Sequence, residues 1–148
     1  SELAHVPVPA LMRRWWLWVP VWAHVVLIYG SSSMPGSAVP SVLPDKPVHG
    51  AVFGLLAGLL LRALAGGRWA GVTAGTAAAA VAITIAYGAS DEWHQSFVPG
   101  RTPELGDFVV DGLAATVVVL TAWAWSIIVV SRAHATRRAG HAAPTFTE

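Results

Sequence analysis

The chain of 148 residues has no cysteine and little charge, because only 11% of its residues are Asp, Glu, Lys or Arg. Without cysteine, disulfides, thiolate metal ligands and a cysteine nucleophile are excluded, and the redox compartment is left open. The scarcity of charge accompanies a hydrophobic content of 55% and a mean hydropathy of +0.58. Both values are far above those of a soluble globular chain of this size. We therefore expect one integral membrane domain.

Four apolar runs approach the length of about 20 helical residues that crosses a hydrocarbon core of about 30 Å. They lie at about 15–30, 48–65, 69–90 and 108–130. Lipid cannot satisfy open sheet edges, and the runs lack the alternation of barrel strands. The sequence therefore predicts an all-α fold, a four-transmembrane-helix bundle. The tail at 131–148 is basic, then small and polar, and we expect it to be flexible.

The distribution of basic residues indicates an orientation. Positively charged loops resist translocation, and seven of the nine Lys and Arg residues precede the first run, lie around the turn between the second and third runs, or follow the fourth. An even number of crossings puts these segments on one side, so the sequence predicts a plasma-membrane protein with both termini in the cytoplasm. The opposite face is acidic. A secretory signal cleaved near Ala38 is the alternative for the first run.

Small residues repeat at four-residue spacing in the second and third runs. Gly50, Gly54 and Gly58 lie in the second run, and Gly71 and Gly75 begin the third. Such stripes let helix backbones approach closely in lipid. We therefore expect the second and third helices to form a tight pair, and packing rather than a cofactor to explain these glycines.

Polar chemistry is concentrated at the expected outer face. Tyr87, Asp91 and Gln95 are four residues apart, so they share one face if the third helix continues past its apolar run. The segment 102–104, Thr-Pro-Glu, is typical of a helix start, and acidic residues follow it into the fourth helix. The candidate site residues are Asp45, Lys46, His49, Tyr87, Asp91, Glu92, Gln95, Arg101, Asp107 and Asp111.

These residues carry a family resemblance that spans about residues 30–115. The segment 45–49 (DKPVH), Tyr87-Gly88 with 91–101 (DEWHQSFVPGR), and Asp107 are similar to the VanZ-like family. In that family D-K-x-x-H precedes helix 2, Y-G-x-x-D-E-x-x-Q-x-F-x-P-x-R follows helix 3, and an aspartate opens helix 4. An asparagine that often follows this aspartate is replaced here by Asp111 or Gly112. The resemblance implies a link to resistance against the lipoglycopeptide teicoplanin.

The first functional hypothesis is an outward-facing polar pocket that binds, with or without modifying it, an envelope lipid or a lipid-linked cell-wall group. Arg101 and Lys46 would clamp a phosphate or carboxylate. The catalytic candidates are Glu92, His49 and Asp91. Desolvation moves the pKa of a carboxylate toward neutral pH, and an imidazole also titrates near neutral pH, so both groups suit acid/base catalysis. Whether the protein is an enzyme stays open at this point.

Two alternatives need no proton transfer. One is a membrane adaptor or shield that occupies lipid, or the acyl tail of a lipoglycopeptide antibiotic. The other is a structural cap in which Arg101 pairs with Asp91 or Asp107. No contiguous basic patch lies outside the short cytoplasmic segments, which argues against nucleic acid as a partner.

A metal site is the remaining possibility for the histidines and carboxylates. Asp45, His49, Asp91, Glu92 and His94 would suit zinc or a harder divalent ion. Their spacing matches no defined metal motif such as H-E-x-x-H. The sequence therefore predicts neither a metal nor another cofactor.

Overall fold

The computed structural model describes residues 10–38 and 45–141, with side chains from 15 to 38 and from 46 to 138. The described residues contain four α-helices and no strand, which confirms the all-α prediction. The helices are α1 (Ala10–Ser32), α2 (Asp45–Leu64), α3 (Ala74–Gln95) and α4 (Leu105–His141), with short 3-10 helices η1 (Gly36–Ala38) and η2 (Trp69–Gly71).

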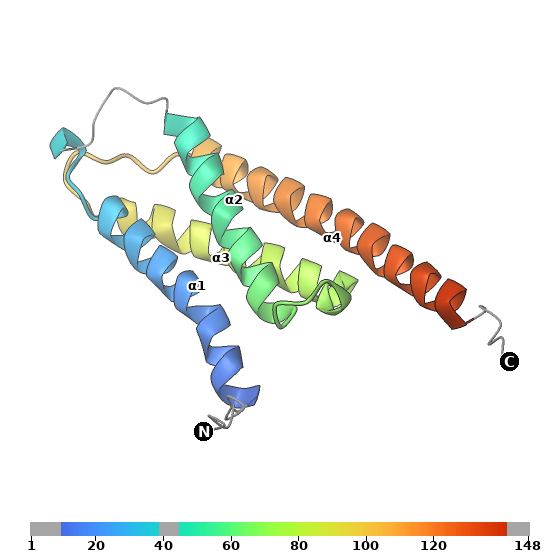
Figure 1. The fold of residues 1–148 in the computed structure, drawn as a ribbon. Helices are drawn as coiled ribbons and strands as arrows, with labels where there is room; N and C mark the ends of the chain where they lie inside the picture. The colour runs from blue at the N-terminus through green and yellow to red at the C-terminus, as the bar shows by residue number, and fades with distance from the viewer. Residues whose placement is uncertain (1–9, 39–44, 142–148) are drawn as a thin grey trace, which may run out of the picture.

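Consecutive helices run in opposite directions and lie side by side (Figure 1). The last turns of α1 and α3 therefore meet the first turns of α2 and α4 at one end of the bundle. The opposite end of α4 extends past the other helices. This arrangement gathers the polar segments of the sequence at a single end, although they are far apart along the chain.

Helix α2 packs most extensively on α4 rather than on α3, so the expected tight pairing of the second and third helices is wrong. A Cβ atom at Gly50 would lie 3.3 Å from Val110, and one at Gly54 would lie 3.3 Å from Val118. The glycine stripe of α2 thus admits the β-branched side chains of α4. In α3, by contrast, a Cβ atom at Gly75 would have no atom of α2 within 4 Å.

Several helix boundaries differ from the expected ones, among them the start of α1 at Ala10 rather than at 15. Helix α3 begins at Ala74 rather than at 69, because Thr73 and Thr76 form a reciprocal capping box. Helix α4 begins at Leu105, after the segment that was expected to start it. Helix α4 also continues past the expected end at 130 to His141, through a segment rich in alanine and arginine, which favour helix. Residues 142–148 lie outside the described part.

Large apolar side chains cover the outside of the bundle. Trp15, Val26, Leu27 and Val117 are each more than 60% exposed, whereas soluble monomers avoid apolar surfaces of this extent. By length and composition, two helical segments of the described chain could cross a membrane, Lys46–Leu64 and Leu105–Arg138. These features support association with a membrane.

Candidate functional site

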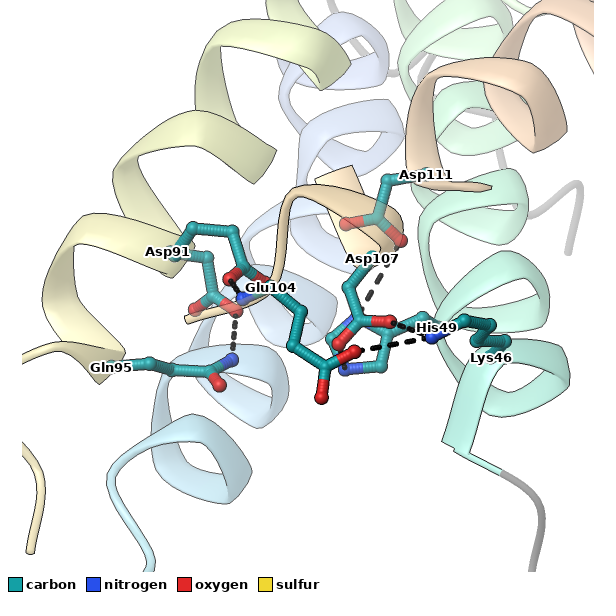
Figure 2. Close-up of polar contacts among 8 residues, drawn as sticks. Lys46, His49, Asp91, Gln95, Glu104, Asp107 and Asp111 are labelled. Atoms are coloured by element: carbon teal, nitrogen blue, oxygen red, sulfur yellow. Dashed lines mark hydrogen bonds and ion pairs between the residues drawn. The ribbon is translucent and has the colours of Figure 1, made fainter. Parts of the chain in front are cut away.

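A cluster of charged side chains lies where α2, α3 and α4 meet. It consists of two residues near the start of α2, one from the last turn of α3, one from the segment just before α4 and two from the first turns of α4 (Figure 2). We call it the polar cluster, and its members are Lys46, His49, Glu92, Glu104, Asp107 and Asp111.

Ion pairs of Lys46 connect α2 to α4. Its Nζ lies 3.2 Å from Glu104 Oε2 and 3.6 Å from Asp107 Oδ1. The side chains of Lys46 and Glu104 are more than half exposed, whereas that of Asp107 is 7% exposed. Exposed pairs of this kind contribute little to stability because water and salt screen them, so Lys46 is more important for neutralising the buried aspartate than for holding the helices together.

The imidazole of His49 lies between two buried carboxylates of α4. Its Nε2 is 4.0 Å from Asp107 Oδ2, and its Nδ1 is 3.5 Å from Asp111 Oδ1. Asp107 and Asp111 are one helical turn apart, which is why both face the same ring. The ring of Phe53 stacks one turn further along α2, with centroids 6.2 Å apart, and closes the apolar side of the site.

Glu92 connects α3 to the start of α4. Its Oε2 accepts a hydrogen bond of 2.9 Å from the backbone N–H of Glu104, at the positive end of the α4 dipole. Burial raises the pKa of the Glu92 carboxyl, and Asp107 and Asp91 raise it further, while the Glu104 amide and His49 oppose the shift. Its Oε1 is buried without a hydrogen-bond partner among the described residues.

A cavity of about 180 Å³ lies beside the polar cluster. Apolar side chains of α1 and α2, including Ile28, Val52 and Phe53, form part of its wall. Gln95 donates a hydrogen bond of 2.9 Å to Asp91 Oδ2, which orients the Asp91 carboxylate. The polar residues that line the cavity are Ser31, Ser32, His49, Asp91, Gln95 and Arg101.

Two connecting segments meet next to Arg101. The backbone N–H of Gly36 donates to the Pro99 carbonyl at 3.1 Å, and Gly100 has a φ of +73°. A Cβ atom at Gly36 would overlap the carbonyl oxygen of Gly100, so this approach requires glycine. The contact fixes the chain that carries Arg101 against the end of α1. The Arg101 Nε is buried and has no hydrogen-bond partner among the described residues.

Two of the residues singled out in the sequence point elsewhere. The Tyr87 hydroxyl donates to the Val25 carbonyl at 3.0 Å and so connects α3 to α1. The His94 Nε2 lies 3.0 Å from Ser33 Oγ. The side chain of Asp45 lies outside the described residues.

The expected cap made by Arg101 is not present in the described structure. Arg101 forms no ion pair there with Asp91 or Asp107, and Lys46 pairs with Asp107 instead. Two contacts of Glu104 were not predicted from the sequence: its side chain pairs with Lys46, and its backbone N–H donates to Glu92. Opposite charges at the starts of α2 and α4 were the available signal. No comparable feature of the sequence indicated that apolar side chains would form a wall of the cavity.

No protein-family model matches the chain, and no curated protein or solved structure is similar to it at a significant level. The functional assignment therefore depends on the geometry of the polar cluster and of the adjacent cavity.

Proposed function

We propose that the chain is a VanZ-like membrane protein with four spans, and that its cavity binds the anionic headgroup of an envelope lipid or lipid-linked cell-wall group. The observation that carries the proposal is the position of Arg101, which lines the cavity with a buried Nε that has no protein hydrogen-bond partner in the described residues. A guanidinium in this situation suits phosphate or carboxylate, which accept from it in a bidentate manner.

The cavity size limits what the protein holds. A volume of about 180 Å³ corresponds to roughly six water molecules at about 30 Å³ each. A phosphate with one small substituent fits such a space, whereas a complete lipid-linked oligosaccharide does not. The rest of the ligand would then lie along the apolar outer faces of the helices, where exposed side chains such as Leu27 and Val26 already favour acyl chains.

The residues that line the cavity can also bind polar groups of the ligand other than its anionic group. Asp91 and Gln95 provide an acceptor and an amide beside Arg101, so hydroxyl or ammonium groups of the ligand would also be satisfied. With both termini in the cytoplasm, this end of the bundle faces the cell envelope. By its resemblance to the VanZ-like family, we connect this binding with resistance to teicoplanin.

The test compares Arg101→Ala with Arg62→Ala, an exposed arginine at the other end of α2. The full chain is reconstituted with anionic phosphatidylglycerol, and bound lipid is counted by native mass spectrometry. Hydrogen bonds to charged groups contribute roughly 1.5–3 kcal/mol, so we expect Arg101→Ala to weaken retention about 10- to 100-fold and Arg62→Ala to leave it unchanged. Equal retention by both variants, with equal teicoplanin susceptibility of the cells, would exclude the proposal.

A non-catalytic adaptor or shield is the second candidate. It is favoured by the Glu92 hydrogen bond to the start of α4, since this contact holds the ends of α3 and α4 together. Envelope lipids from cells with the wild type and with Glu92→Gln distinguish an adaptor from a protein that modifies the lipid it binds. A chemically altered lipid that disappears with Glu92→Gln indicates turnover, and identical lipids with retained resistance indicate an adaptor.

A further inference from the structure

Three side chains of the polar cluster come together from three helices. One nitrogen or oxygen atom each of His49, Glu92 and Asp107 lies within 4.8 Å of the other two. Divalent transition metals bind imidazole nitrogen and carboxylate oxygen at about 2.0–2.2 Å, which places tetrahedral ligands about 3.5 Å apart. Rotations that move each ligand atom by roughly 1 Å would therefore bring the three onto one ion.

A fourth side chain points independently to a metal. Asp111 is 1% exposed, its Oδ1 faces His49 Nδ1 at 3.5 Å, and its Oδ2 has no hydrogen-bond partner among the described residues. Histidines that bind metals usually donate their second ring N–H to a carboxylate, which fixes the tautomer. Asp111 occupies this position, and it leaves Nε2 directed to Asp107, 4.0 Å from Oδ2.

The charge balance of the cluster favours a cation. Glu92, Asp107 and Asp111 bring three carboxylates into one region, and within the described chain Lys46 is the lysine or arginine side chain that pairs with them. Lys46 is 55% exposed and is shared with Glu104. Buried carboxylates without a compensating charge are strongly destabilising, whereas a bound divalent ion becomes the dominant local charge.

We infer that His49, Glu92 and Asp107 bind a divalent transition metal such as Zn²⁺, and that Asp111 positions the imidazole. Three protein ligands leave one coordination position for water or another oxygen donor, as in catalytic rather than structural zinc sites. The site connects α2, α3 and α4 at the end of the bundle. It goes beyond the proposed lipid binding, because it needs no lipid and does not use Arg101.

The first experiment measures metal binding by the untagged full chain in nanodiscs, with Co²⁺ as a spectroscopic probe and elemental analysis after dialysis against Zn²⁺. We expect one equivalent for the wild type and loss of that equivalent in His49→Ala. The control is His94→Ala, which removes a histidine from the same end of the bundle that contacts Ser33 instead of the cluster, and it should retain the metal.

The second experiment uses the absence of cysteine from the chain. In His49→Cys the new thiol is unique, so a charge-transfer band in the Co²⁺ spectrum would identify this position as a ligand even if His49→Ala does not fold. Asp111→Asn should keep the stoichiometry but weaken affinity roughly 10- to 100-fold, as expected for a carboxylate that orients a histidine ligand.

Two results would overturn the inference: no metal on the wild type, or metal that both His49→Ala and His49→Cys retain with unchanged spectra. Arg101→Ala separates this question from lipid binding. We expect it to bind metal like the wild type while it loses lipid. A wild-type protein that retains lipid through Arg101 but binds no Co²⁺ or Zn²⁺ would refute the metal site and leave the proposed function intact.

Discussion

Glu92 combines two roles that usually belong to different residues. Its Oε2 accepts the Glu104 amide and so stabilises the start of α4, while burial raises the pKa of the same carboxyl. The groups that face it are His49 from α2, Asp107 from α4 and Asp91 from its own helix. A raised pKa means that the folded state binds the proton more tightly than the unfolded chain does.

Stability should therefore depend on pH through Glu92. Above the ordinary pKa of 4.5 the unfolded chain has lost its proton while the folded protein retains it, so the free energy of unfolding falls as pH rises through this window. Glu92→Gln lacks this slope and keeps an acceptor for the Glu104 amide. Its thermal midpoint should therefore rise relative to that of the wild type as the pH increases from about 4 to about 7.

The measurement is a thermal scan of both proteins in the same detergent with a metal chelator present. All other ionisable groups are the same in both proteins, so the difference between the two curves isolates Glu92. A difference that stays constant or shrinks with pH would contradict a raised pKa.

At the level of single residues, spacing along helices predicted which acidic side chains share a face. Asp107 and Asp111 are four residues apart, and both face the ring of His49. The partners across the helices were not predictable, because they depend on the rotation of each helix about its axis. His94 turns toward Ser33 for that reason.

At the level of elements, the contact between α2 and α4 organises the bundle. Gly50, Gly54 and Gly58 of α2 face Val110, Ala114 and Val118 of α4. The sequence predicted that the glycines allow close packing but assigned the wrong partner. Glycine at four-residue spacing marks a face of one helix, and it carries no information about which neighbour lies against that face.

Gly54→Leu should push α4 away from α2. A Cβ at Gly54 already lies 3.3 Å from Val118, and overpacking of this kind costs about 1–3 kcal/mol. The matched control is Gly30→Leu in α1, where a Cβ meets no atom within 4 Å.

Thermal denaturation of both variants provides the measurement. Leucine is the better helix former at either position, so Gly30→Leu should be neutral or slightly stabilising, whereas Gly54→Leu should lower the midpoint. Equal effects would show that close packing at Gly54 contributes nothing to stability.

At the level of the whole molecule, composition predicted the helical fold and the apolar exterior. It did not predict the ends of the helices. Because Thr73 and Thr76 form a reciprocal cap, α3 begins five residues later than the apolar run suggested. In the same way, α4 continues because no proline interrupts it after the apolar run.

The proposed orientation can be tested with single cysteines, since the chain contains none. Ser37→Cys in η1 and Ala135→Cys in α4 both replace exposed residues at opposite ends of the bundle. In intact cells, a membrane-impermeant maleimide should label Ser37→Cys at least about tenfold faster than Ala135→Cys, because the bilayer excludes the reagent from the cytoplasm. Permeabilised cells should label both, and the reverse pattern in intact cells would invert the topology.

The length of α4 has a consequence in this orientation. The 34 residues of Leu105–Arg138 rise about 50 Å at 1.5 Å per residue, while the hydrocarbon core is about 30 Å thick. Measured from Leu105, Arg132 lies about 40 Å along the axis and reaches the lipid phosphates. In the proposed orientation, Arg137 and Arg138 would then lie in the cytoplasm a further turn or more along the helix, at a distance from the membrane that is set by the helical rise.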